Sequence, residues 1–249
     1  MKPVWRGIAL GAGAYLLFLI VNVPAAWVAA RIGGVMPQVQ LSGIDGSLWS
    51  GRADQLRFDP VILEQVQWRW HPFALALGRL EYRVEGRWGD NPVAMSAGAS
   101  LFGGAYLRDV SATGPVQSWA AALALPVEAS GDLSLALDQV RFAKPGGAPI
   151  LRGAARWTSA TVTGPVALDL GQVNLDLAPD GDVTHGTVKA QDGALLVDGT
   201  VDLDASGQYN LQVDMTPTDK LADDVRGGLA AIAEEHNGRY HLIWNGAVK

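Results

Sequence analysis

Apolar and polar residues alternate along most of the chain beyond residue 38. Val66, Trp68 and Trp70 alternate with polar neighbours, for example. The same period recurs at Val39 and Leu41; at Leu133, Leu135 and Leu137; at Val166, Leu168 and Leu170; at Val173, Leu175 and Leu177; at Val201 and Leu203; and at Tyr209, Leu211 and Val213. A period of two sends successive side chains to opposite faces of a strand. The pattern predicts an antiparallel sheet with one apolar face and one polar face.

Turn-forming residues separate these segments. They occur at Asp45-Gly46, Pro145-Gly146-Gly147, Asp180-Gly181, Asp192-Gly193 and Ser206-Gly207. Glycine and its polar partners favour the tight connections between antiparallel strands. The spacing therefore predicts a meander, in which each strand pairs with the next along the chain.

The stretch GIDGSLWSGRA contains the strongest turn signal, Asp45-Gly46. A two-residue type I′ turn needs positive φ angles, which Asp and Gly tolerate, so we predict a hairpin with strands over 38–44 and 48–58. Gly51 is expected to mark a bulge or a close backbone approach in the second strand. We interpret the stretch as a structural hairpin anchored by Trp49.

Residues 7–30 form an uncharged, largely apolar run of 24 residues. As a helix it would extend about 36 Å, compared with a hydrocarbon core of about 30 Å. Arg6 precedes the run and Arg31 follows it, while Trp5 and Trp27 lie near its two ends, where indoles favour the membrane interface. The run predicts a transmembrane anchor with residues 1–6 in the cytoplasm and residues 31–249 across the membrane.

A cleaved signal peptide is the alternative interpretation of the N-terminus. Val23-Pro24-Ala25 places small residues where a signal peptidase would cut. The apolar run is longer than the usual apolar region of a signal peptide and continues past Ala25, which favours the anchor.

A helix is predicted near the C-terminus. Its apolar positions are Leu221, Val225, Leu229 and Ile232, and Asp219 is a candidate for its N-cap or first turn. Asn237-Gly238 follows, and then a last strand over residues 239–245.

The charge beyond the apolar run is negative. Because two of the 19 Lys and Arg residues precede the run, 17 of them face all 25 Asp and Glu residues, a formal charge of −8. This balance argues against nucleic acid as a partner, since phosphate binding requires a basic patch. Cysteine is absent from the sequence, which excludes disulfides and thiolate chemistry.

Candidate metal sites are weak. Residues 202–207 resemble the first half of a calcium-binding loop, but the twelfth position is Val213 instead of glutamate, so we interpret them as a strand and a turn. His236 and His241 lack a third ligand at a suitable spacing. The sequence contains no GxSxG, HExxH or GxxxxGK[ST] motif. We predict no enzymatic activity, no cofactor and no metal.

Several short motifs follow one another in an order that resembles protein N of the bacterial type II secretion system. They are G-x-L-W-S-G (Gly46, Leu48, Trp49, Gly51), W-x-W-H-P (Trp68, Trp70, Pro72), G-R-L (Gly78, Leu80) and N-G-x-Y (Gly238, Tyr240). Each motif alone is short, and their order after an N-terminal apolar segment carries the resemblance. Residues 90–214 contribute only strand patterning.

The resemblance implies a single-pass inner-membrane protein with a periplasmic β domain. Its implied role is that of a non-enzymatic accessory subunit that binds other secretion components, on the inner-membrane platform or on the outer-membrane secretin. A more distant similarity to AsmA-like proteins implies an extended, curved antiparallel meander sheet with an apolar groove for lipid. The alternative functions are therefore a periplasmic lipid-binding or lipid-transfer module and, from the acidic surplus and His236 with His241 alone, a periplasmic hydrolase.

Overall fold

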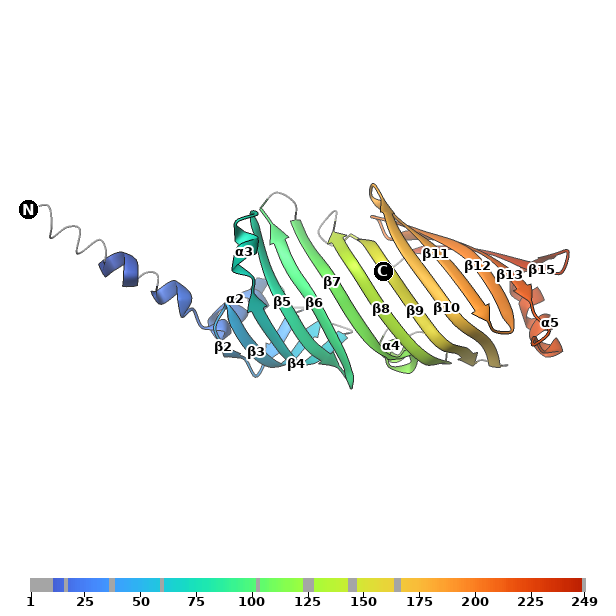
Figure 1. Ribbon diagram of the computed structural model, residues 1–249, viewed down its shortest axis with the longest axis horizontal. Helices are drawn as coiled ribbons and strands as arrows, with labels where there is room; N and C mark the ends of the chain where they lie inside the picture. The colour runs from blue at the N-terminus through green and yellow to red at the C-terminus, as the bar shows by residue number, and fades with distance from the viewer. Residues whose placement is uncertain are drawn as a thin grey trace, which may run out of the picture.

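One antiparallel sheet dominates the computed structural model, which describes residues 11–15, 18–35, 39–58, 61–101, 104–122, 128–142, 147–163 and 167–247. Within these ranges the sheet has 15 strands in the order β1-β3-β4-β5-β6-β7-β8-β9-β10-β11-β12-β13-β15-β14, and β2 pairs with β3 (Figure 1). The strands are β1 Val39–Ser42, β2 Asp45–Gly46, β3 Ser50–Phe58, β4 Val61–Trp70, β5 Arg79–Trp88, β6 Asn91–Ser100, β7 Gly104–Pro115, β8 Glu128–Phe142, β9 Pro149–Thr163, β10 Ala167–Asp180, β11 Val183–Asp192, β12 Leu195–Asp204, β13 Gln208–Pro217, β14 Glu234–His236 and β15 Arg239–Ala247. The predicted antiparallel meander is confirmed.

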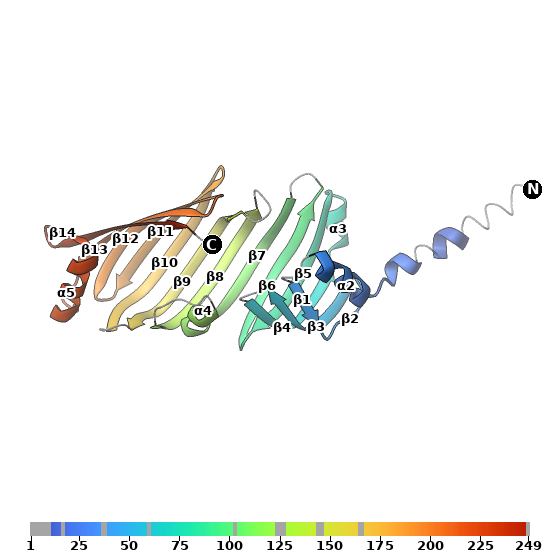
Figure 2. The same ribbon diagram turned by 180° about the vertical axis from the view of Figure 1, so that it is seen from behind.

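In the described part of the chain, the helices beside the sheet are α2 Ala25–Val35, α3 Pro72–Leu75, α4 Val116–Ala122 and α5 Asp223–Ile232. Figure 2 shows α2, α4 and α5 on the near face of the sheet, while α3 lies at the ends of β4 and β5. Residues 11–15 and 18–21 are also helical.

The apolar face runs without interruption from one end of the sheet to the other. Paired residues share a face, and the pairing register joins Ala112, Leu135, Ala155, Leu175, Val188, Gly199 and Val213 across seven strands. Ala112 belongs to one buried cluster and Val213 to a second. The alternation in the sequence thus predicted the buried face correctly.

The first cluster lies at the N-terminal end of the sheet. Leu63, Val66 and Val93 are buried in it, and Trp119 of α4 packs edge-on against Trp88 with ring centroids 4.5 Å apart. The second cluster lies at the C-terminal end of the sheet, where Leu229 of α5 is buried with Leu195, Val213, Met215 and Tyr240. In the strands between them some apolar side chains, such as Val140 and Ile150, are buried, whereas others, such as Leu135 and Leu175, are half-buried.

Bulges marked by a residue with positive φ bend β4, β7 and β9. Gln65, Asp109 and Ser159 have φ angles of 51°, 49° and 51°, and each lies at a register shift with a neighbouring strand. A bulge inserts one residue, bends the strand and increases its twist. The bulge at Gln65 allows Leu63 and Val66, an odd number of positions apart, to enter the same buried cluster.

Several predicted elements differ in detail. The helix near the C-terminus is confirmed, but Asp219 neither caps it nor lies in its first turn, because a turn closed by Leu221 N–H on the Thr218 carbonyl precedes it and α5 begins at Asp223. The predicted last strand is confirmed as β15, and Asn237-Gly238, with φ angles of 53° and 74°, forms a tight turn that joins it to the unpredicted strand β14. Val166 lies outside the described residues.

The N-terminal segment is helical with a break. Helical structure stops at Asn22–Pro24 and resumes in α2, because Pro24 lacks the N–H that an uninterrupted helix requires. One continuous helix to residue 30 was therefore a wrong prediction at this point. Among the described residues, no helix combines the length and apolar character needed to cross a bilayer. Residues 7–10 and 16–17 of the predicted anchor lie outside the described residues.

Candidate functional site

The turn at Leu48-Trp49 joins the sheet to the break in the N-terminal helix. Leu48 N–H donates to the Val23 carbonyl oxygen at 2.8 Å, and Trp49 Nε1 donates to the Ile20 carbonyl oxygen at 2.8 Å. Pro24 also forms an isolated bridge with Ser47. The backbone carbonyl groups that lose their helical partners at the break thus accept hydrogen bonds from the hairpin.

The hairpin was predicted, but its turn was placed three residues too early. Asp45 and Gly46 are paired with Arg52 and Gly51, and the chain reverses between Ser47 and Ser50. The contacts of Leu48 and Trp49 with the helix break hold the turn there, so a tertiary contact overrides the local preference of Asp-Gly.

Three tryptophans unite two of the sequence motifs. The rings of Trp49 and Trp70 lie 4.4 Å apart between centroids at an interplanar angle of 49°, and Trp70 N–H donates to the Trp49 carbonyl oxygen at 2.6 Å. Trp68 Nε1 donates to the Ser47 carbonyl oxygen at 3.2 Å. Burial raises the pKa of Tyr82, which pairs with Trp70 on β5, so its hydroxyl stays neutral. The motifs G-x-L-W-S-G and W-x-W-H-P form one unit.

The glycines of the first motif allow β2, β3 and β4 to approach closely. A Cβ at Gly51 would lie 2.6 Å from the Asp45 carbonyl oxygen and 2.5 Å from the Trp68 ring. Gly46 has a φ of 97°, and its Cβ would lie 2.7 Å from Gly51 Cα. The close approach predicted at Gly51 is confirmed, but the predicted bulge is wrong, because the register with β4 passes Gly51 without a shift.

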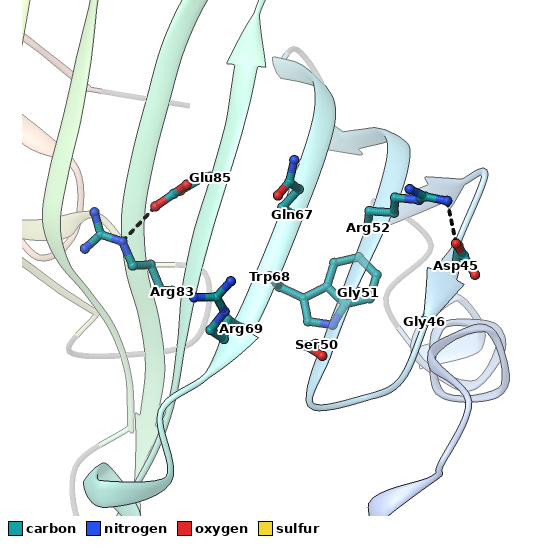
Figure 3. A pocket seen from close by; sticks show the side chains of 10 residues that line it. All are labelled: Asp45, Gly46, Ser50, Gly51, Arg52, Gln67, Trp68, Arg69, Arg83 and Glu85. Carbon is teal, nitrogen blue, oxygen red and sulfur yellow. Dashed lines mark hydrogen bonds and ion pairs between the residues drawn. The ribbon is translucent and has the colours of Figure 1, made fainter.

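A hollow of about 420 Å³ opens over β2 to β5 beside this unit (Figure 3). Its floor includes the cross-strand series Asp45, Arg52, Gln67 and Glu85, on the face opposite to Val66. Two exposed ion pairs lie in it: Arg52 to Asp45 at 2.7 Å and Arg83 to Glu85 at 2.9 Å. These polar residues were not predicted as a site, although the sequence shows them at the polar positions of adjacent predicted strands.

Arg69 supplies an unneutralised charge in the hollow. It pairs in register with Arg83 on β5, and within the part of the chain that the structure describes it has neither an ion pair nor a side-chain hydrogen bond. Like charges directly opposite each other on adjacent strands repel. Guanidinium groups bind carboxylates and phosphates through paired donors. The arrangement therefore favours an anionic group and offers no nucleophile paired with a base.

The other predicted residues are divided between the two ends of the sheet. Pro72 begins α3, and Gly78 and Leu80 follow that helix close to Trp70. Gly238 and Tyr240 lie with the C-terminal cluster, where Tyr240 is buried. Trp27 and Arg31 contact each other on α2, with the guanidinium carbon 5.1 Å from the ring centroid. Trp5 and Arg6 lie outside the described residues.

The histidines and the calcium-like loop have ordinary partners. His241 Nδ1 lies 2.8 Å from Asp214 Oδ1, and His236 is exposed on β14. Asp204 Oδ1 accepts hydrogen bonds from the Ser206 hydroxyl and backbone N–H and from Gln208 N–H, and the Ser206 hydroxyl contributes most to lowering its pKa. Nowhere in the described ranges do three or more His, Asp or Glu side chains gather as metal ligands would.

Comparison with known proteins gives a consistent result. Residues 37–242 match the family model described as type II secretion system (T2SS), protein N. The chain is 29% identical to a type II secretion system protein N from Aeromonas hydrophila over 248 residues, which cover 96% of this chain and 97% of that protein. It is 28% identical to the protein of that name from Vibrio cholerae serotype O1 over 231 residues, which cover 89% and 90% of the two chains.

The third relative is the type II secretion system protein N of Klebsiella pneumoniae. It is 29% identical over 175 residues, which cover 68% of this chain and 67% of that protein. No solved structure matches the fold. The family match includes the hairpin, the tryptophan unit and the hollow, and extends to the last strand. The chain belongs to the family of type II secretion system protein N.

Proposed function

We propose that the chain is a non-enzymatic accessory subunit of the type II secretion machinery, anchored in the bacterial inner membrane. Residues 7–30 form the anchor, residues 1–6 remain in the cytoplasm, and residues 31–249 form a periplasmic β domain. The family match supports the secretion role. The uncharged run in the sequence supports the anchor, together with the Trp27 and Arg31 side chains, which suit a membrane interface.

The domain acts by binding other secretion components, and the Arg69–Arg83 pair carries this proposal. The two like-charged side chains lie opposite each other in an exposed hollow, and among the residues that the structure describes no carboxylate pairs with Arg69. A carboxylate on a partner would relieve the repulsion and satisfy guanidinium donors. We therefore assign the hollow to an acidic segment of another secretion component, on the inner-membrane platform or in the periplasmic region of the secretin.

A complementation experiment tests this role. A strain lacking the gene should retain exoproteins in the periplasm while their passage across the inner membrane stays normal. Arg69→Glu should fail to restore release, whereas Arg57→Glu, at an exposed position of β3 outside the hollow, should restore it. A photocrosslinking side chain at position 69 should capture a secretion component. Full release in the deletion strain would overturn the proposal.

The central apolar face favours a second candidate, lipid binding. Some apolar side chains of β8 to β10, namely Leu135, which adjoins the first cluster, and Trp157 and Leu175, are only half-buried. An extended apolar strip of this kind suits an acyl chain. If the deletion strain secretes normally and the purified full chain carries phospholipid that Leu135→Asp displaces, the lipid-handling function replaces the secretion role.

A further inference from the structure

Large apolar side chains are exposed together in the loops that follow strands β4 and β6. Phe73, Leu75 and Leu77, in and just after α3, are 79%, 54% and 72% exposed, and Leu101, at the end of β6, is 75% exposed. Ala74 is the one described residue of α3 that is buried. Such a cluster on adjacent loops marks an interaction site, because isolated exposed apolar residues are common but contiguous ones are not. We call these four exposed residues the apolar lip.

Hydrogen bonds fix the backbone of the loops that carry the lip. His71 N–H donates to the Glu81 carbonyl oxygen at 2.9 Å, and Leu101 N–H donates to the Gly78 carbonyl oxygen at 3.0 Å, which places the two loops side by side. The Tyr106 hydroxyl reaches across β6 and donates to Glu81 Oε2 at 2.8 Å. These bonds hold the apolar tips outward, so the lip does not need to fold in order to bind.

The lip and the N-terminal helical segment lie at the same end of the sheet. Trp70 immediately precedes the loop of α3, and its ring packs on Trp49, whose indole N–H is bonded to the Ile20 carbonyl. Figure 1 shows α3 and the N-terminal segment together at the β2–β5 end. Among the described residues of that segment, Tyr15, Phe18, Leu19, Ile20 and Val21 have exposed apolar side chains.

The chemistry of the lip favours a lipid surface over a protein partner. Its tips are Phe and Leu without polar groups, and four side chains are too few for the roughly 800 Å² that each partner buries in a stable protein interface. Arg79 follows Leu77 in the chain, and the charges of Arg79 and Arg108 act on the Tyr106 hydroxyl together with that of Glu81. Aliphatic and aromatic tips with flanking basic residues are typical of interfacial membrane contacts.

We propose that the apolar lip is a second membrane contact, inserted into the interfacial layer of the bilayer that holds the N-terminal segment. This inference rests on the proposed anchoring. A second contact would restrict rotation of the sheet about the helix break at Asn22–Pro24. It would also hold the arginine hollow at a constant height above the membrane.

Site-directed fluorescence on the full chain tests the proposal, and the absence of native cysteine makes single labels unambiguous. The reporter is Ala76→Cys carrying an NBD fluorophore, because Ala76 is exposed within the α3 loop and its replacement leaves the lip intact. Leu19→Cys reports on the anchor. Asp182→Cys is the matched control, in the exposed turn between β10 and β11.

Each protein is reconstituted into vesicles of phosphatidylcholine and phosphatidylglycerol that contain a nitroxide on the upper acyl chain. We expect blue-shifted emission and strong nitroxide quenching at position 76, and neither at position 182. Phe73→Ser combined with Leu77→Ser should abolish both effects at position 76 without lowering the Tm, since both side chains are exposed.

The outcomes separate the two proposals. Quenching at position 19 without quenching at position 76 overturns the lip and leaves the anchor standing. Quenching at position 76 without quenching at position 19 supports the lip and overturns the anchor. If position 76 is shielded only after another secretion component is added, the occupant is a protein and the lip proposal is wrong.

Discussion

Replacing Trp49 by alanine should destabilise the full chain by about 3 kcal/mol. A buried tryptophan removes about 150–250 Å² from water, and the Trp49 indole is half-buried, so about 100 Å² at about 25 cal/mol per Å² gives about 2.5 kcal/mol. The ring pair with Trp70 and the hydrogen bond to Ile20 add about 0.5–1 kcal/mol, because part of their contribution is already counted in the buried area. Full burial would have predicted about 3–5 kcal/mol.

The variant Trp49→Phe separates these contributions. It keeps an aromatic ring beside Trp70 but removes the bond to the Ile20 carbonyl and the area of the second indole ring, so we expect a loss of about 1–2 kcal/mol. Both free energies of unfolding are obtainable from denaturant titrations of the detergent-solubilised protein followed by far-ultraviolet circular dichroism. Limited proteolysis should show faster cleavage near Asn22–Pro24 in Trp49→Ala, because the hairpin no longer holds the break.

Trp244→Ala is the matched control, since Trp244 is 59% exposed on β15 at the other end of the sheet. By the same area arithmetic it should cost about 2 kcal/mol, less than Trp49→Ala. If Trp49→Ala costs no more than this control, the structural assignment of Trp49 is refuted. Unchanged stability with lost secretion would instead make Trp49 a contact residue for a partner.

Three further predictions follow from local geometry. Gly51→Ala should destabilise the fold by about 2 kcal/mol or more in the same titration, because the new methyl overlaps the Asp45 carbonyl and the Trp68 ring. Gly227→Ala and Gly228→Ala meet open space in α5 and should each stabilise it by about 1 kcal/mol, seen as a higher Tm. Because folding lowers the pKa of Asp204, its carboxylate contributes stability that is complete above the ordinary aspartate pKa of about 3.9. This stability is lost as the pH falls through the lowered pKa, and Asp204→Asn should remove this acid dependence.

The strands were predictable because their burial repeats every two residues along one persistent face. Leu133, Leu135 and Leu137 reveal that face locally, and the register then carries it across the sheet. Asn237-Gly238 was predictable for a similar reason, since both φ angles of the turn are set by these two residues alone. Features determined within a few residues are therefore the ones that the sequence indicates.

Features determined by distant contacts were missed or misplaced. The first hairpin turns at Leu48-Trp49 because Val23 and Ile20, more than twenty residues earlier, supply its partners. The charge at Arg69 depends on the register that places it opposite Arg83, which no local pattern encodes. The family motifs pointed to this region correctly, because their residues Trp49, Trp68 and Trp70 form the tryptophan unit, but they gave no sign of the arginines beside it.

The proposed orientation has a geometric consequence for the secretion machine. The path of the sheet crosses 14 strands, and at about 4.8 Å per neighbouring pair its far end lies about 60 Å from the strands that hold the helix break. The apolar lip and Arg69 lie at the end of the sheet that holds the helix break. The turns after β10 and β12 instead carry Asp180, Asp182 and Asp204, which anionic lipid would repel. Membrane contact is thereby confined to the first strands. A crosslinker at Arg69 should consequently capture an inner-membrane component, and one at Trp244 should capture a component that extends deeper into the periplasm.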